Sequence, residues 1–151
     1  MKRKESLRNV PSGHDGSGFI TINGRVVPGF LVSKLSVKAD TIVSSKRFLG
    51  ERVSQNAPRG LDITGNLSYY HKTAALMKAI EDYKNGGEYP EITIQSWAEV
   101  AKTGRCEVLL TDVILKSIGL GGLDDGSDDA TVFDTDITAD DFHIISKFNE
   151  V

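Results

Sequence analysis

Two segments in which apolar and polar residues alternate constrain the fold more than any other feature of the sequence. Aliphatic side chains alternate with charged and hydroxyl ones in FLVSKLSVKA (residues 30–39) and again in GLDITGNLSYY (residues 60–70). The polar side of the first segment is Lys34, Ser36 and Lys38, and the apolar side of the second is Leu61, Ile63, Leu67 and Tyr69. Because successive side chains of a strand point to opposite faces, both segments are predicted to be strands with one wet face.

The connection between these two strands is unusually long. It contains SKRFLGERVSQNAPRG (residues 45–60), in which neither a helical nor a strand period is clear. Connections in compact domains usually have about 4–6 residues, and structureless ones beyond about 12–15 tend to be functional or disordered. Residues 40–60 are therefore predicted to be a functional loop. Its candidate residues are Lys46, Arg47, Phe48, Leu49, Arg52 and Arg59.

The rest of the chain is read mostly as strands. Asn23-Gly24 predicts a tight hairpin, because both residues tolerate a positive φ. One amphipathic helix is expected at residues 73–85, where Asn-Gly-Gly ends the pattern. Strands are expected in EITIQSWAEV and in a long run, CEVLLTDVILKSI.

Beyond that run the sequence predicts a Gly/Asp loop at residues 119–130 and short β-prone pieces near 131–133 and 142–145. Residues 1–18 are polar and Gly/Ser-rich, so we expect a flexible N-terminal arm followed by one domain at residues 19–151. The predicted fold class is mainly β (α+β): an antiparallel sandwich or barrel-like domain with one flanking helix.

The composition of the chain indicates the type of protein and the cellular compartment in which it is made. The chain has 151 residues, 39% hydrophobic and 26% charged, which is ordinary for a globular domain. Polar residues follow the basic start MKRKESLRNV where a signal peptide needs an apolar core. The one cysteine, Cys106, precludes an internal disulfide. A cytoplasmic site of synthesis, without a membrane partner, is expected.

Charge is distributed very unevenly along the chain. Lys and Arg number 11 against 4 Asp and Glu in residues 1–60, 6 against 8 in residues 61–118, and 1 against 9 in residues 119–151. Complementary potentials steer association and fix its register. The gradient is consistent with contact between the basic region of one copy and the acidic region of another, and equally with solvated faces that have no partner.

No catalytic or metal-binding constellation is found in the sequence. His14, His71 and His143 lack an acid or cysteine at a recognised spacing, and Cys106 has no local base. The acidic loop LDDGSDDATVFDTD departs from the order of a calcium loop. The chain is expected not to be an enzyme and to need no cofactor or metal.

Nucleic-acid binding is an alternative role for the long connection. Its four basic side chains could neutralise phosphates while Phe48 stacks on a base. The acidic net charge of -3 and the single aromatic side chain weigh against this role. A monomeric β-rich module that binds nucleic acid or carbohydrate stays open beside an assembly role.

The order of these pieces resembles the tail tube proteins of contractile-tailed phages, in particular the PBSX-like prophage and R-type bacteriocin tubes. The resemblance covers roughly residues 19–118. It rests on FITINGRVVPGFLVSKLSVKAD, KRFLGERVSQNAPRGLDITGNLSYYH and the helix that follows. The C-terminal third matches no pattern that can be carried over.

The resemblance implies a structural protein that forms rings of six subunits, which stack into the hollow inner tube of a tail. Strands would pair across subunits into one inner barrel, and polar faces would line either the lumen or the outer surface. The implied partners are further copies of the chain, the tail sheath, baseplate, tail terminator and tape measure proteins, and DNA in passage without specific binding. The implied place is the virion tail, assembled in the bacterial host cytoplasm.

On this reading residues 40–60 are an arm that reaches a neighbouring subunit or ring. Phe48 and Leu49 would anchor the arm, and its basic residues would meet acid on the partner. The expected acidic surface comprises Asp124, Asp125, Asp128 and Asp129. Whether the parent particle carries DNA, is a headless killing tail, or is a non-contractile or secretion tube stays open.

Overall fold

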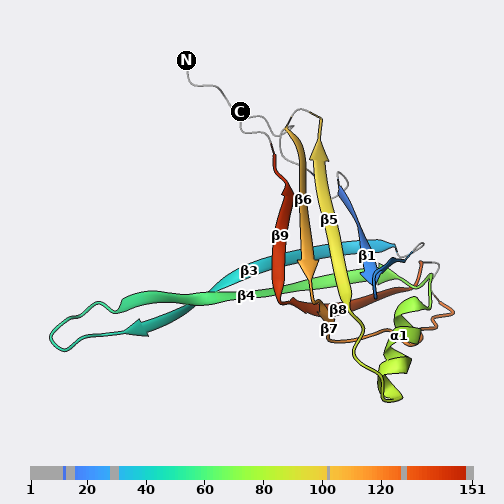
Figure 1. Cartoon of the computed structure of the whole chain (residues 1–151), viewed down its shortest axis with the longest axis horizontal. Coiled ribbons are helices and arrows are strands. Elements are labelled where there is room, and N and C mark those ends of the chain that lie inside the picture. The colour runs from blue at the N-terminus through green and yellow to red at the C-terminus, as the bar shows by residue number, and fades with distance from the viewer. Residues whose placement is uncertain (1–11, 13–15, 28–30, 102, 127–128, 149–151) are drawn as a thin grey trace.

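Two antiparallel sheets cross each other in a computed structural model, which describes residues 12, 16–27, 31–101, 103–126 and 129–148. The five-stranded sheet has the order β2-β1-β5-β6-β9, and the four-stranded sheet has the order β3-β4-β8-β7 (Figure 1). The elements are β1 (Gly16–Ile22), β2 (Arg25–Val26), β3 (Val32–Lys46), β4 (Gln55–Tyr70), α1 (Ala75–Lys84), β5 (Ile92–Val100), β6 (Gly104–Thr111), β7 (Ile114–Leu115), β8 (Val132–Ala139) and β9 (Asp141–Ser146). The predicted class, mainly β with one helix, is confirmed.

An apolar core lies where the two sheets cross. Ile20, Ile92 and Ile94 come from the five-stranded sheet, and Leu67 and Ile137 come from the four-stranded sheet. The predicted inward side of β4 is confirmed at Ile63, Leu67 and Tyr69, whose side chains are all buried. Leu61 was predicted on the same side but is exposed, because that part of β4 extends beyond the core.

The chain passes between the sheets at two neighbouring corners. CEVLLTDVILKSI was predicted to be one long strand, and this is wrong: β6 ends at Thr111 and β7 begins at Ile114. Asp112 between them has φ 51°, a left-handed conformation that breaks the strand. Asp140 makes the second corner between β8 and β9, and its N–H donates to the carbonyl of Thr111 at 3.2 Å. Such bends let strands continue from one sheet into a crossed one.

The Asn-Gly hairpin is confirmed. Asn23 and Gly24 have φ 51° and 82° and join β1 to β2, as a primed turn requires. The predicted flexible arm at residues 1–18 was too long, since β1 begins at Gly16. A Cβ at Gly18 would lie 2.9 Å from the carbonyl oxygen of Gln95, so glycine lets β1 and β5 pair closely there. Residues 1–11 and 13–15 lie outside the described part of the chain.

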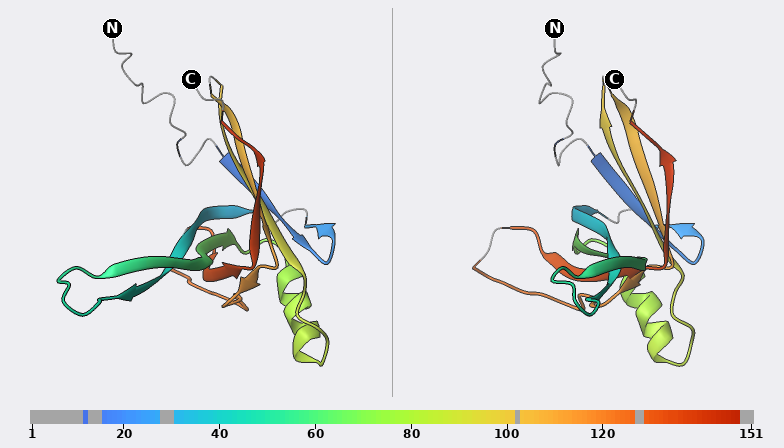
Figure 2. Two further views of the ribbon diagram at one scale, coloured as in Figure 1. Left: turned by 60° about the vertical axis from the view of Figure 1, so that its left-hand side comes forward. Right: turned by 90° about the vertical axis from the view of Figure 1, so that its left-hand side faces the viewer.

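The helix is confirmed close to its predicted bounds, as α1. Leu76 is its buried side chain, and the helix ends in Asn85-Gly86, where Gly86 has φ 100°. The N–H of Gly87 donates to the carbonyl of Asp82 at 3.0 Å. α1 covers the end of the molecule opposite the long hairpin described next (Figures 1 and 2).

The long connection between the two strands is mostly a β-hairpin. The prediction that residues 40–60 form a loop is therefore wrong for most of this segment, and its functional role stays a prediction. β3 continues to Lys46 and β4 begins at Gln55, and their pairing is continuous apart from irregularities between Val32 and Lys34 and between Ile42 and Val43. Residues 40–60 form what we call the arm. The arm shows no apolar period because neither of its faces is buried, so nothing in its sequence had to alternate.

Candidate assembly interface

The arm projects from the body as an isolated two-stranded ribbon (Figure 1). Its outermost pair is Lys46 and Gln55, and its turn is stabilised by a 3.1 Å hydrogen bond from the N–H of Glu51 to the carbonyl of Phe48. Gly50 has φ 87° within that turn. A two-stranded hairpin is at best marginally stable in water by itself, so a ribbon of this length indicates that a partner supports it.

Apolar side chains on the arm are open to solvent. Leu49 is 105% exposed and Phe48 is 54% exposed, both at the tip. Ile42, Val43 and Val53 are exposed as well. An apolar patch rimmed by charge marks an interaction surface. The charged residues around it are Lys46, Arg47, Glu51, Arg52 and Arg59, all exposed.

The outward side of the four-stranded sheet is polar. Lys34, Ser36 and Lys38 from β3 lie on it, as predicted from the alternation. Across β4 and β8, the amide of Asn66 donates to the carboxylate of Asp136 at 3.2 Å. We call this side the polar face. Its polar side chains come from β3, β4 and β8 and from the residue directly after β7: Lys34, Ser36, Lys38, Thr64, Asn66, Ser68, Asp134, Asp136, Thr138 and Lys116.

The sheet that carries the polar face ends in two unpaired strands. β3 has only β4 as its neighbour and β7 has only β8 among the described residues. Unpaired edges expose backbone N–H and C=O groups that can pair with another chain. The arm continues directly from β3, so the arm and one free edge form a single surface.

The predicted acidic surface lies in the segment between β7 and β8. The described residues of this segment, 119–126 and 129–131, are here called the acidic loop, and they project from the body (Figure 2). Asp124 and Asp125 are exposed, and a carboxylate oxygen of Asp124 accepts a 3.0 Å hydrogen bond from the N–H of Gly126. Asp129 is exposed, and Asp128 lies outside the described residues. The described part of the acidic loop lies away from the arm of the same chain (Figure 1).

Two exposed leucines in the acidic loop, Leu120 and Leu123, were not among the predicted interface residues. Leu123 is 104% exposed and Leu120 is 71% exposed. The signal was present in GLGGLDDG, where large apolar residues occur in a glycine-rich loop with no strand period to bury them. Both side chains are open to solvent and Leu123 directly precedes Asp124, so they are candidates for a contact with another copy.

The histidines and the cysteine do not come together in the described part of the chain. His71 packs edge-on against Phe133 with ring centroids 5.0 Å apart, and His143 lies 3.4 Å from the carboxylate of Asp141. Cys106 is a free thiol, partly buried, and His14 lies outside the described residues. Among the residues the structure describes, no cluster of three or more His, Cys, Asp or Glu could hold a metal ion. Likewise, no described helix has the length and apolar character needed to cross a bilayer.

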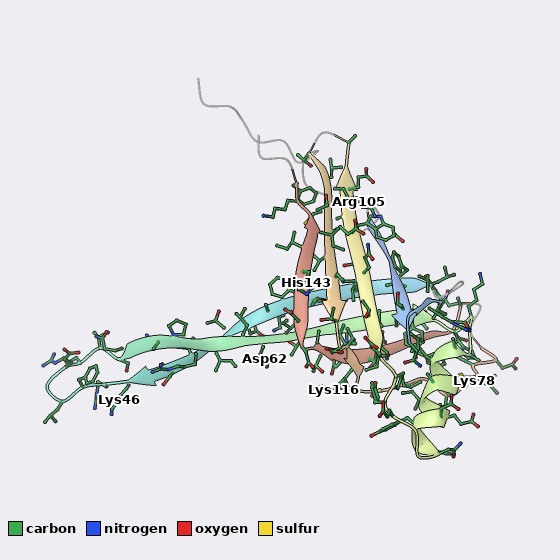
Figure 3. All side chains as sticks on the ribbon, in the orientation of Figure 1. Lys46, Asp62, Lys78, Arg105, Lys116 and His143 are labelled. Atoms are coloured by element: carbon green, nitrogen blue, oxygen red, sulfur yellow. The ribbon has the colours of Figure 1, made fainter. Side chains whose placement is uncertain are left out.

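Arg105 anchors a small polar cluster on the outward side of the five-stranded sheet, far from Lys46 on the arm (Figure 3). Its guanidinium carbon lies 4.4 Å from the centre of the Trp97 ring, and its Nε lies 3.3 Å from a carboxylate oxygen of Glu107. Gln95 donates a side-chain hydrogen bond to the same carboxylate. Cation–π stacking and hydrogen bonding hold β5 and β6 together here, so the cluster is structural.

The crossed sheets and the long hairpin define the class of protein. The fold is similar to a chain in the six-fold symmetrised baseplate of the anti-feeding prophage, with a TM-score of 0.65, 15% identity, and coverage of 96% of this chain and 97% of that one. It is also similar to a chain in the sheath-tube complex of an extracellular contractile injection system in its extended state, with a TM-score of 0.64, 14% identity, and coverage of 95% and 100%. These likenesses show a fold found in contractile injection particles.

Sequence comparison narrows the class to a family. The family model described as "Phage tail tube protein" matches residues 5–146. The uncharacterized protein YqbM of Bacillus subtilis (strain 168) is 27% identical over 139 residues, which cover 91% of each chain. This chain belongs to the phage tail tube protein family. It is a structural component of a tail tube, and the resemblance found in the sequence is confirmed.

Proposed function

We propose that copies of this chain form rings of six, which stack into the hollow inner tube of a contractile tail. The observation that carries the proposal is the arm, whose apolar tip is left exposed by the described part of its own chain. The six-fold symmetry of the baseplate that contains a similar fold supports the ring size. The role is mechanical, and the proposal assigns the chain no catalytic step.

In this proposal the arm is the element that joins neighbouring copies. Phe48 and Leu49 are buried against the partner, and each buried side chain of this kind contributes about 1.5–3 kcal/mol. The basic residues of the arm meet acidic groups in the C-terminal third of the neighbour, where Asp140 and Asp141 are exposed. Association is thereby steered by charge and held by apolar burial.

We further assign the polar face to the lumen. Free edges β3 and β7 at opposite sides of the four-stranded sheet allow identical copies to continue one sheet around a closed ring, because a head-to-tail contact closes when its rotation does. The polar face would then line the lumen with mixed charges, through which DNA passes without specific binding. The sheath, baseplate and terminator would contact the outside and ends of the tube, and the tape measure protein would occupy the lumen during assembly in the host cytoplasm.

The arm gives a direct test. Ser45 and Asn56 face each other in the hairpin, so replacing residues 46–55 by Asn-Gly shortens the arm while keeping the register and offering a two-residue turn. The wild-type protein should form hollow tubes or stacked rings in negative-stain microscopy, whereas the shortened protein should stay monomeric with an unchanged circular dichroism spectrum.

One outcome would overturn the role of the arm alone, and another would overturn the tube itself. Tubes of normal length from the shortened protein would show that the arm is not needed for assembly. A wild-type protein that stays monomeric at high concentration and retains DNA in a salt-sensitive way would instead favour a monomeric binding module.

A further inference from the structure

An open groove of about 660 Å³ lies between the two sheets, beside the free edge of β3. It exists because β5 and β6 extend past the point where β3 crosses them, so the upper part of their inner face is not covered (Figure 1). Ala98, Cys106 and Val108 line it from the five-stranded sheet, and Leu35 and Val37 line it from β3. The groove is mostly apolar, so it fits an apolar occupant.

The charges of the groove are of one sign. Among the described residues that line it, only Lys34 and Lys38 are charged. Their side chains alternate onto the polar face of the edge strand β3, so they border the groove at its open rim and not at its apolar floor. Lys38 also lies 3.6 Å from the carboxylate of Asp40, and both side chains are largely exposed. Exposed ion pairs contribute little, so this lysine can exchange its partner at small cost. An occupant that carries acid next to its apolar residues would match the groove.

The described chain offers two exposed apolar tips, and their charges differ. The tip of the arm places Phe48 and Leu49 next to Arg47, so it is basic. The acidic loop places Leu123 directly before Asp124 and Asp125. Like charges across a contact are unfavourable and opposite charges fix its register. The groove therefore matches the acidic loop and disfavours the tip of the arm.

The position of the acidic loop excludes the chain's own groove and favours that of another copy. The loop leaves the four-stranded sheet just after β7, at the edge opposite β3. Its start is held near the core, where the N–H of Gly119 donates to the hydroxyl of Tyr69 at 3.2 Å. A head-to-tail contact that sets the β7 edge of one copy beside the β3 edge of the next brings the loop toward the neighbour's groove.

We propose that the acidic loop of one copy inserts Leu120 and Leu123 into the groove of the next copy, with Asp124 and Asp125 facing Lys34 and Lys38. The inference rests on the proposed tube, because it requires identical neighbours in a ring. It gives each copy two separate contacts: the loop in the groove along the sheet edge, and the arm against other acidic groups such as Asp140 and Asp141. The acidic loop thus serves lateral contact within a ring rather than acting as the receptor of the arm.

The single native cysteine provides the test, because Cys106 lines the groove and Leu123 is fully exposed in the unassembled chain. In tubes of Leu123→Cys, mild oxidation or a short bis-maleimide should link Cys106 of one copy to position 123 of the next and give a ladder of multimers on a denaturing gel. A disulfide needs Cα atoms within about 7 Å, so distant sites will not join. Leu123→Cys with Cys106→Ser should give no ladder beyond a dimer, because a ladder requires two linked positions in each copy.

Two further cysteine variants control for other contacts. Val26→Cys, in the exposed strand β2, should give no ladder. Leu49→Cys at the arm tip tests the competing occupant, and a ladder from this variant without one from Leu123→Cys would overturn the inference while leaving the tube intact. Tubes of Leu123→Cys that yield no ladder would overturn it too.

Protection of the native thiol gives an independent readout. In the wild type, Cys106 should react with a maleimide at least about tenfold more slowly in tubes than in unassembled protein, and Leu120→Ser with Leu123→Ser should remove that protection. Equal reactivity in wild-type tubes and unassembled protein would contradict the inference. Failure of the wild type to form any tubes would instead count against the proposed function, so the two failures are distinguishable.

Discussion

The hydroxyl of Ser68 donates a hydrogen bond to a carboxylate oxygen of Asp134 and so joins β4 to β8 across the polar face. Ser68 is only 5% exposed, although it lies on the outward side of the sheet. Two residues away on the same strands, the side chain of Asn66 on β4 donates a hydrogen bond to Asp136 on β8 in the same way. Polar residues on this face are therefore part of what holds the sheet together, as well as what it presents outward.

Ser68→Ala should lower the free energy of unfolding by about 1–2 kcal/mol, because Asp134 loses a charge-assisted hydrogen bond in a half-covered site. Ser36→Ala on the same face is the matched control. Ser36 is exposed on β3, and its loss should change stability by less than about 0.5 kcal/mol. Urea unfolding of the unassembled protein measures both, and equal effects would show that the Ser68 contact contributes nothing specific.

Gly119→Ala should destabilise the chain by about 1–3 kcal/mol, since a methyl group there would overlap the ring of Phe133. Gly121→Ala, two residues along the same loop, is the control, because a Cβ there meets nothing within 4 Å. Thermal unfolding should therefore show a lower midpoint for the first variant alone. An unchanged midpoint for Gly119→Ala would mean that the Phe133 ring moves aside freely.

Phe48→Ser should raise the protein concentration needed for tube formation by at least about tenfold, because about 1.4 kcal/mol of lost burial per contact corresponds to that factor. The melting temperature of the unassembled protein should not change, since Phe48 is at the solvent-exposed tip. Val26→Ser, an equally exposed position on β2, should assemble normally. Sedimentation at graded concentrations distinguishes these outcomes, and normal assembly of Phe48→Ser would remove its role as an anchor.

Neutralising the arm should weaken assembly and reduce its dependence on salt. With Lys46, Arg47, Arg52 and Arg59 all changed to Gln, four exposed pairs of about 0.3–0.5 kcal/mol each would be lost, which is roughly a tenfold rise in the assembly concentration. Wild-type tubes should weaken between low and high ionic strength, and the variant should respond much less. Light scattering across a salt series measures this, and an identical salt dependence for both proteins would refute charge steering by the arm.

The sequence predicted elements best where one side of a strand is buried. Ile63, Leu67 and Tyr69 alternate because they face the core, and the Asn23-Gly24 turn was visible because few residues accept a positive φ. The corner at Asp112 was not predicted, because the residues on both sides of it favour strands and a single aspartate does not reveal a left-handed conformation. The strands of the arm were missed because both of their faces are exposed to solvent, so their sequence shows no alternation of apolar and polar residues.

The candidate interface was only half visible in the sequence. The charge gradient and the tip residues Phe48 and Leu49 marked the arm, because its composition departs from that of an ordinary loop. The groove could not be predicted, since it depends on how far β5 and β6 extend past β3, which is set by the crossing of two sheets. Its lining residues belong to strands that otherwise appear as ordinary core in the sequence.

The narrowness of the arm has a mechanical consequence. Between Asp40 and Lys46 it extends roughly 20 Å at the usual rise per residue, with only two strands in cross-section. Because the arm is almost entirely exposed and has no third strand or packed layer to stiffen it, its tip can rotate relative to the body without disturbing the core. In the proposed tube, subunits joined through such ribbons can each rotate slightly, so the filament can bend by many small rotations without breaking any of these contacts.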